Sequence, residues 1–235
     1  MKYLEQRLEM CEIGKSLWIR NYCAGNEGNI SQRLPDGTIL CTPTGVSNGD
    51  LVAEQLCVVN LDGEVLLGEL KPSSELKMHL EIYRRRADVG AVVHAHPKHV
   101  LTLAIANKPL PYAIYPEAEL FLGEIARMPY RALGSSLLAK TLGEQVTPET
   151  TAIIMANHGA TTFASDLRQA YYNMEILESF CQVLIQCKQF GSYQLLSVVD
   201  MQDLMATKKK LGLLDSRQSF NSLEMANCAK SFFGF

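Results

Sequence analysis

Two short apolar runs constrain the fold of this chain more than any other feature of its sequence. The first is GAVVHAH (90–96), which contains two β-branched valines and ends at Pro97, and the second is TAIIM (151–155). Short apolar runs with β-branched residues, bounded by turn formers, are typical of buried strands. The sequence therefore predicts two strands in the interior of a sheet.

The periodicity of the remaining chain places helices around these strands. Apolar residues recur at helical spacing over 3–22, and Ser74 is a plausible N-cap for a further helix over 74–86. Further helices are predicted at 98–106, 166–190 and 200–211, and short extended stretches at 30–34, 38–41, 57–60 and 64–67. Strands early in the chain, with helices before, among and after them, indicate an α/β fold with helices packed on a mostly antiparallel sheet. A chain of 235 residues fits one domain, residues 1–235.

Composition and charge exclude several classes of partner. The chain has 22 Lys and Arg against 25 Asp and Glu, a formal net charge of -3, so no basic excess points to nucleic acid. It has neither an uncharged apolar run of about 18 residues, as a membrane span needs, nor the pattern of a signal peptide at its N-terminus. Seven scattered cysteines without a CxxC pair indicate reduced thiols, and the expected location is the cytoplasm.

Three histidines form the strongest candidate for a metal site. His94 and His96 are two residues apart at the end of a predicted strand, so their side chains project to the same face. His158 follows the second apolar run, and Gly159 beside it would let the backbone approach a ligand closely. Three histidines with a fourth position open are expected of a catalytic zinc site. The alternative is a chance pair of histidines and a hydrogen-bonded core histidine.

The other two histidines lie in predicted helices. His79 and His99 are expected to be surface residues or neighbours of the ligands.

Three small-polar segments could hold a phosphate group: GNEGNIS (25–31), CTPTG (41–45) and KPSSE (71–75). Each offers backbone N–H groups and hydroxyl or amide donors, and Ser73 and Ser74 would lie at a helix N-terminus, where the dipole favours an anion. They could equally be ordinary turns. Glu75 follows directly and could move protons if its surroundings bring its pKa towards neutrality, or it could be a solvated first-turn glutamate.

Together these residues resemble the class II aldolase/adducin head family. The matches run in order through Gly28-Asn29-Ile30-Ser31, Thr42-Pro43-Thr44-Gly45, Pro72-Ser73-Ser74-Glu75, His94-Ala95-His96-Pro97 and Asn157-His158-Gly159. The resemblance covers about residues 5–210 and leaves a C-terminal tail at 213–235. It implies a three-layer fold in which His94, His96 and His158 ligate zinc and Glu75 is an acid/base. The phosphate would be held by Asn29, Thr44, Gly45, Ser73 and Ser74.

The resemblance also implies a reaction and an assembly. The expected function is that of a zinc-dependent lyase (aldolase), which cleaves a small sugar phosphate by a retro-aldol reaction through a metal-stabilised enediolate. The expected assembly is a homotetramer whose sites are shared between subunits. A sugar-phosphate epimerase or dehydratase of the same family is the alternative, and a non-catalytic adducin-like interaction module is a further one.

The resemblance places a second acid/base on a neighbouring subunit, within the segment YPEAELFLG (115–123). Glu119 is expected at that position, with Tyr115 and Glu117 as alternatives. The alternative without function is that Glu119 is an exposed helix residue with no catalytic role. In the tail, Phe232, Phe233 and Phe235 could pack against a neighbouring subunit, close over a site, or be frayed.

Overall fold

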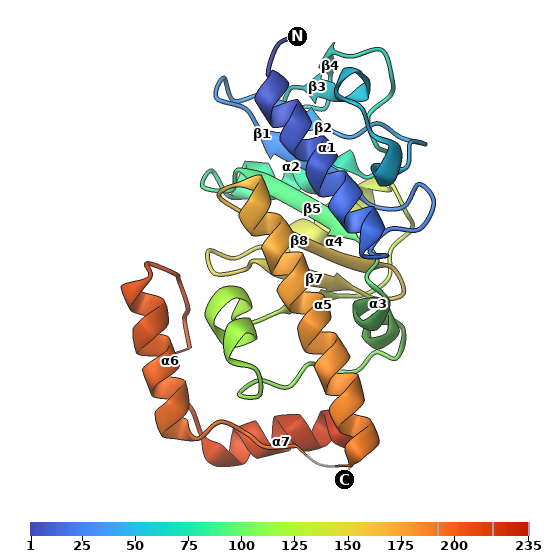
Figure 1. The fold of residues 1–235 in the computed structure, drawn as a ribbon. Coiled ribbons are helices and arrows are strands. Elements are labelled where there is room, and N and C mark those ends of the chain that lie inside the picture. The colour runs from blue at the N-terminus through green and yellow to red at the C-terminus, as the bar shows by residue number, and fades with distance from the viewer. Residues whose placement is uncertain (192, 218, 235) are drawn as a thin grey trace.

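Both apolar runs of the sequence form strands of a single eight-stranded sheet (Figure 1). The computed structural model describes residues 1–191, 193–217 and 219–234. Across the sheet the strand order is β4-β3-β2-β1-β5-β8-β7-β6. All neighbouring strands are antiparallel except β6 and β7, which are parallel. The strands are β1 (Asn29–Arg33), β2 (Ile39–Cys41), β3 (Cys57–Val59), β4 (Val65–Leu67), β5 (Ala91–Ala95), β6 (Ala126–Met128), β7 (Ala152–Met155) and β8 (Gly159–Ala164).

Helices cover both faces of the sheet and make three layers. The helices are α1 (Leu4–Ile19), α2 (Leu76–Arg85), α3 (Lys98–Ile105), α4 (Ser136–Gly143), α5 (Leu167–Phe190), α6 (Val198–Lys210) and α7 (Ser222–Phe233). Alternation along β5 assigns the faces, because Val93 joins the core formed with α1, α3 and α5, whereas Val92 joins the core formed with α2 and α4. His94 follows Val93 and therefore lies on the α2 side. The predicted α/β fold with a mostly antiparallel sheet is confirmed.

The predicted elements are present, with ends shifted by a few residues. Asp166 caps α5 by accepting a hydrogen bond from the Gln169 amide, and the helix ends at Gly191 in the left-handed conformation. The expectation that Ser74 caps the next helix is wrong, because the N-cap of α2 is Glu75. In the turn before α2 the Glu75 amide donates to the Ser73 hydroxyl, which delays the helix start to Leu76.

Several elements lay outside the sequence prediction, namely β6, β8, α4, α7 and a short π-helical turn, η3 (Ala118–Leu122). The expectation that the phenylalanines of the C-terminal tail are frayed or pack against a neighbouring subunit needs correction, because α7 packs on its own subunit. Phe232 and Phe233 are 1% and 2% exposed and belong to the core that contains α5. They are neither frayed nor free for a neighbouring subunit, since burying two phenyl rings stabilises the chain itself. Phe235 lies outside the described residues.

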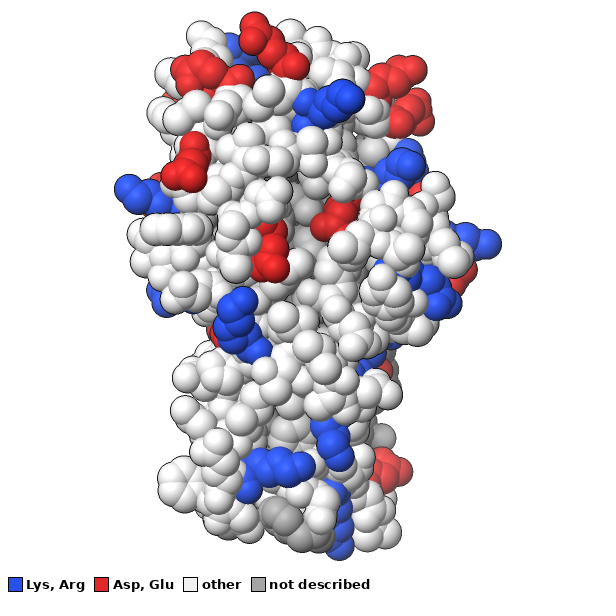
Figure 2. Space-filling model, turned by 90° about the vertical axis from the view of Figure 1, so that its right-hand side faces the viewer, with Lys and Arg blue, Asp and Glu red and all other residues white. Residues whose placement is uncertain are grey.

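The surface carries no broad basic area on the face shown in Figure 2, where acidic and basic side chains are scattered over a mostly uncharged surface. Within the described residues, none of the helices is long and apolar enough to cross a membrane.

Candidate metal centre and active site

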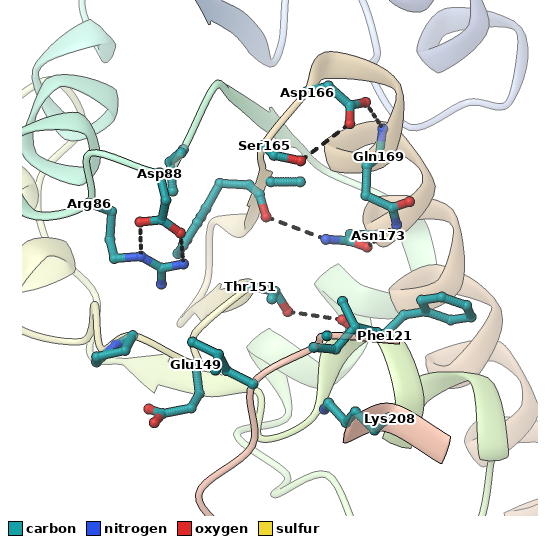
Figure 3. Close-up of a pocket in the computed structure, with 17 residues that line it drawn as sticks. Arg86, Asp88, Phe121, Glu149, Thr151, Ser165, Asp166, Gln169, Asn173 and Lys208 are labelled. Atoms are coloured by element: carbon teal, nitrogen blue, oxygen red, sulfur yellow. Dashed lines mark hydrogen bonds and ion pairs between the residues drawn. The ribbon is translucent and has the colours of Figure 1, made fainter. Parts of the chain in front are cut away.

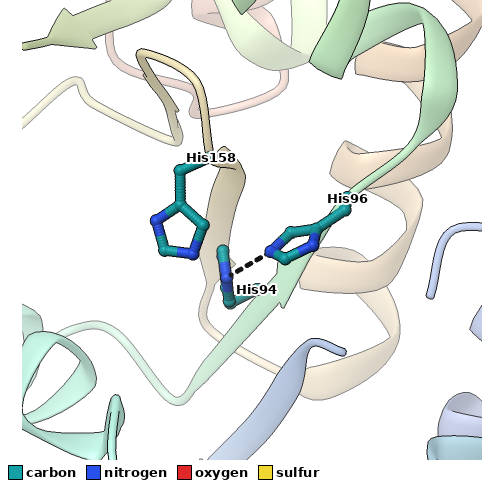
Figure 4. Close-up of side chains that lie close together, drawn as sticks. All are labelled: His94, His96 and His158. Carbon is teal, nitrogen blue, oxygen red and sulfur yellow. Dashed lines mark hydrogen bonds between the residues drawn. The ribbon is translucent and has the colours of Figure 1, made fainter. Parts of the chain in front are cut away.

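The three predicted histidines converge on one point (Figure 4). His94 is the fourth residue of β5, His96 follows the strand, and His158 lies in the turn between β7 and β8. Their ring centroids are 4.8 to 5.1 Å apart. One ligand nitrogen from each ring lies within 4.8 Å of the others. A common centre therefore lies within about 2.8 Å of each nitrogen, close to the zinc–nitrogen bond length of about 2.0–2.1 Å.

The surroundings of His94 and His96 indicate which nitrogen of each ring can bind an ion. The Nδ1–H of His94 donates to the Ala160 carbonyl at 2.9 Å, so the His94 Nε2 lone pair is available for an ion. Burial lowers the pKa of His94 and of His96, so both rings are neutral near pH 7. His96 Nε2 lies 3.1 Å from His94 Nε2, and His96 Nδ1 lies 3.4 Å from a Glu27 carboxylate oxygen, so the single His96 proton can go to either partner.

With the His96 proton on Nδ1, towards Glu27, the two Nε2 lone pairs repel at this distance unless a cation lies between them. His158 adds to this picture, because both of its ring nitrogens are buried and have no hydrogen-bond partner within the described part of the chain. Buried nitrogens without partners cost about 1–3 kcal/mol each. A divalent ion at the common centre would therefore satisfy ring nitrogens that the three rings cannot satisfy among themselves.

The local backbone explains how His158 reaches this point. Asn157 has φ +59°, a left-handed conformation that asparagine tolerates, and the His158 amide donates to the Met155 carbonyl at 3.1 Å. This tight turn reverses the chain from β7 into β8. Gly159 follows, and a Cβ there would lie 2.5 Å from Cδ2 of His96.

Gly159→Ala is expected to lower the affinity for zinc by about tenfold or more, because the added methyl group must displace the His96 ring from the common centre. Competition against a chelator measures the change. Gly37→Ala is the matched control, since it has a positive φ but nothing within 4 Å of the added Cβ. An unchanged affinity in the Gly159 variant contradicts the tight packing of His96 against this backbone.

Glu75 lies directly beside the histidines. Its two carboxylate oxygens are 3.4 Å from His94 Nε2 and 3.2 Å from His158 Nε2, and the Asn29 side-chain amide donates to it at 3.0 Å. Burial by itself raises the pKa of Glu75, but the positive charge of His94 and His158 when these rings are protonated, together with the hydrogen bond from Asn29, outweighs burial and holds that pKa below its ordinary value. A divalent ion bound by the same rings would act in the same direction. Glu75 is therefore ionised at neutral pH. The expectation of a pKa brought towards neutrality is not met in the free protein.

The predicted phosphate segments lie side by side next to Glu75. Pro43 and Pro72 form an isolated β-bridge, the Thr44 amide donates to the Lys71 carbonyl, and the Ser73 amide donates to the Thr42 carbonyl. Asn29 is 5% exposed and reaches the same place through its bond to Glu75. The remaining predicted phosphate residues are partly or fully exposed: Thr44, Gly45, Ser73 and Ser74.

Glu119 lies elsewhere, inside its own subunit. It is 3% exposed, and its carboxylate accepts a 2.7 Å bond from Arg217 and a 2.6 Å bond from the Ala113 amide. The alternative that Glu119 is merely an exposed helix residue is therefore wrong. Glu117 is exposed and Tyr115 is partly exposed, with its ring stacked on Phe180. A catalytic role for any of the three stays a prediction.

His79 is buried under the site, so the expectation of a surface position for it is wrong and the alternative, a neighbour of the ligands, remains. The side chain is 1% exposed, and Nδ1 lies 2.7 Å from the Ser31 hydroxyl. Its Nε2 is buried without a hydrogen-bond partner among the described residues. A signal was present, because His79 stands four residues after Glu75 and between Met78 and Leu80, on the apolar side of the helix.

Burial of His79 predicts a loss of stability in mild acid. Burial lowers the pKa of His79 to about 4 from 6.5, so between these pH values the unfolded chain binds more protons than the folded chain. The stabilisation is complete above pH 6.5 and falls by about 3 kcal/mol as pH drops to 4. Urea unfolding of metal-free protein at a series of pH values measures this slope. His79→Gln should reduce this slope, while His94 and His96, whose pKa values burial also lowers, keep contributing to it. An equal slope in both proteins excludes His79 as a contributor.

A separate cavity of about 430 Å³ lies at the other end of β5 and β8 (Figure 3). Its charged and amide side chains are already paired within the chain. Arg86 binds Asp88, Asp166 accepts from the Gln169 amide, and Asn173 donates to the Phe163 carbonyl. The cavity is lined by none of the three histidines. The histidine cluster is therefore the better candidate for chemistry.

Comparison with known proteins defines the class to which this fold and histidine cluster belong. Residues 8–185 match the family model described as Class II Aldolase and Adducin N-terminal domain. The chain belongs to this family, and the sequence-based assignment is confirmed.

Relatives with several reaction names share the family. The L-fuculose phosphate aldolase of Methanococcus maripaludis (strain S2) is 38% identical over 176 residues, which cover 74% of this chain and 93% of the relative. The 3-oxo-tetronate 4-phosphate decarboxylase of Pectobacterium atrosepticum is 36% identical over 187 residues, or 76% of this chain and 83% of the relative. A solved L-fuculose 1-phosphate aldolase superposes with a TM-score of 0.79 at 28% identity, covering 89% of this chain and 98% of that one.

Proposed function

We propose that this chain is a zinc-dependent lyase that cleaves a small ketose phosphate by a retro-aldol reaction. The observation that carries the proposal is the convergence of three histidine rings, each with one ligand nitrogen, beside an ionised glutamate, Glu75. Relatives named as L-fuculose phosphate aldolase and 5-deoxy-D-ribulose 1-phosphate aldolase support the reaction class. The proposal includes one zinc ion per subunit, held by His94, His96 and His158, and a cytoplasmic location.

Zinc at this place would supply Lewis-acid chemistry, which polarises a carbonyl and stabilises the negative charge that develops when a carbon–carbon bond breaks. The residues of the chain would do the remaining work. Backbone N–H groups and hydroxyls of the segments 42–45 and 71–74, with Asn29, would hold the phosphate. Binding energy from this remote group would fix the reacting carbons against Glu75.

Glu75 would move the proton. In a retro-aldol cleavage the C4 hydroxyl loses its proton, the C3–C4 bond breaks to give an aldehyde, and the bonding electron pair passes to the ketone half as an enediolate. That enediolate must then receive a proton at C3. A carboxylate that is ionised at neutral pH begins as a base and can return the proton it has accepted.

The second proton-transfer group would come from the segment 115–123 of a neighbouring subunit in a homotetramer. Glu119 would have to leave its bond to Arg217 to serve in this way, whereas Glu117 is already exposed. Three single variants, Glu119→Gln, Glu117→Gln and Tyr115→Phe, separate the candidates. The group that acts in proton transfer should lower kcat about 100-fold or more when replaced. Equilibrium sedimentation tests the tetramer.

Turnover of a defined panel of substrates tests the proposed reaction. Zinc-loaded protein is incubated with ketose 1-phosphates and 5-phosphates, L-fuculose 1-phosphate among them. Release of an aldehyde with a triose phosphate or another short phosphate supports the lyase. An isomerised or dehydrated product indicates the epimerase or dehydratase instead. If wild-type protein binds no zinc and turns over no member of the panel, the adducin-like interaction module becomes the better description.

A decarboxylase is the second candidate, because relatives of 35 to 36% identity carry the name 3-oxo-tetronate 4-phosphate decarboxylase. Loss of carbon dioxide from a 3-oxo acid also leaves an electron pair beside a carbonyl group, so the same charge needs stabilising. Adding 3-oxo-tetronate 4-phosphate to the panel decides between the two. Carbon dioxide release without an aldehyde product favours the decarboxylase.

A further inference from the structure

A buried chain of hydrogen bonds lies on the α2 side of the sheet, below Glu75. The Tyr83 hydroxyl is 2.9 Å from Ser31 Oγ, and Ser31 Oγ is 2.7 Å from His79 Nδ1. Ser31 lies on β1, while Tyr83 and His79 lie one turn apart on α2. The three residues are 0%, 2% and 1% exposed. Neither the metal ligands nor the proposed phosphate contacts use them.

Two hydrogen-bond directions are compatible with these distances, because the Tyr83 and Ser31 hydroxyls and the neutral His79 ring can each donate or accept. Burial lowers the pKa of His79 to about 4, so the ring carries a single proton at neutral pH. In the first direction Tyr83 donates to Ser31, Ser31 donates to His79 Nδ1, and the His79 proton is on Nε2. In the second direction His79 Nδ1 donates to Ser31, and Nε2 is an acceptor.

In the first direction the Nε2–H group of His79 is a buried donor without a partner among the described residues. Leaving such a donor unpaired costs about 1–3 kcal/mol. Glu75 precedes His79 by four residues, which puts both side chains on one side of the helix start. Glu75 Oε1 and Asn29 Oδ1 are likewise buried without a hydrogen-bond partner among the described residues. One donor and two acceptors match the bonding capacity of a single water molecule.

We propose that His79 is a positioning residue whose Nε2–H, oriented by Ser31 and Tyr83, holds the Glu75 carboxylate facing the three histidines through one bridging water. The inference rests on the proposed role of Glu75 in proton transfer. Its physical basis is that a carboxylate held by a fixed donor needs no reorientation when the proton moves.

Two substitutions at His79 separate positioning from packing. His79→Asn places an amide near the former Nδ1 and loses the distal donor, whereas His79→Gln reaches the former Nε2 position and can still donate. We expect His79→Asn to lower kcat on the substrate found in the panel about 10- to 100-fold, as for outer partners of catalytic metal sites. KM and zinc content should not change. His79→Gln should recover most of the lost kcat, and equal losses in the two variants overturn the inference.

A spectroscopic measurement tests the hydrogen-bond direction without any turnover. Nitrogen-15 NMR of the zinc-loaded wild-type protein, with His79 assigned from the His79→Gln spectrum, should report a ring protonated at Nε2 only. In Tyr83→Phe the tautomers should mix, because Ser31 is then free to donate elsewhere. A ring protonated at Nδ1 overturns the inference even if Glu75 is catalytic. If the NMR result is as expected but Glu75→Gln retains full turnover, the proposed function fails instead.

Discussion

His94→Ala is expected to remove high-affinity zinc binding and, with it, all measurable turnover. His94 is 0% exposed, its Nδ1 is fixed by the Ala160 carbonyl, and its Nε2 faces the other two rings. Loss of a residue that only hydrogen-bonds to a metal ligand typically weakens metal binding by about 10- to 100-fold. Loss of one of the three ligands themselves should weaken zinc binding by more than this. Zinc content after dialysis and chelator competition measure the effect.

The control for this prediction is another histidine of the same chain. His99 lies on α3 and its ring binds Glu178 at 2.8 Å, outside the convergent cluster. His99→Ala should retain zinc. Because His94 is buried, His96→Ala repeats the test at a more exposed ligand, whose side chain is 13% exposed. Wild-type zinc affinity in both ligand variants is incompatible with the proposed metal centre.

Glu75→Gln is expected to lower kcat by about 100- to 10,000-fold, the range typical of a lost general acid or base. The amide keeps the shape of the side chain but cannot accept a proton at neutral pH. Zinc should still bind, since the three imidazoles remain in place. Steady-state kinetics with zinc quantified in the same sample measure the two properties together.

Glu81→Gln is the matched control, because Glu81 lies on the same helix and pairs only with Arg84 and Arg85 at the surface among the described residues. Its kcat should equal that of the wild type. A Glu75 variant that turns over as fast as the Glu81 variant excludes Glu75 as the proton-transfer group.

The metal ligands could be predicted from the sequence because the direction in which their side chains point depends on the local secondary structure. His94 and His96 follow from the two-residue period of a strand, which puts alternate side chains on one face. Their pairing with His158 required a further assumption, that the two apolar runs end at the same edge of the sheet. The structure satisfies it through β8, which places Thr161 opposite His94 and starts directly after His158. That strand was not predicted from the sequence.

The surroundings of the ligands could not be predicted, because they depend on contacts between distant segments. Glu75 is ionised because Asn29 from β1 and His94 from β5 face its oxygens. His79 was expected at the surface or near the ligands, and it is buried where α2 packs against β1, with its ring bonded to Ser31 of that strand. Glu119 is held by Arg217, 98 residues further along the chain.

The sequence by itself determined the fold class, the family and the identity of the three candidate metal ligands, since strand period, turn residues and motif order are properties of short segments. Only the tertiary structure decided the charge state of Glu75, the buried hydrogen-bond chain beneath it and the burial of Glu119 and the tail phenylalanines. The physical reason is that a pKa or an exposed fraction depends on which atoms surround a group. Those atoms come from strands and helices that meet only when the chain folds.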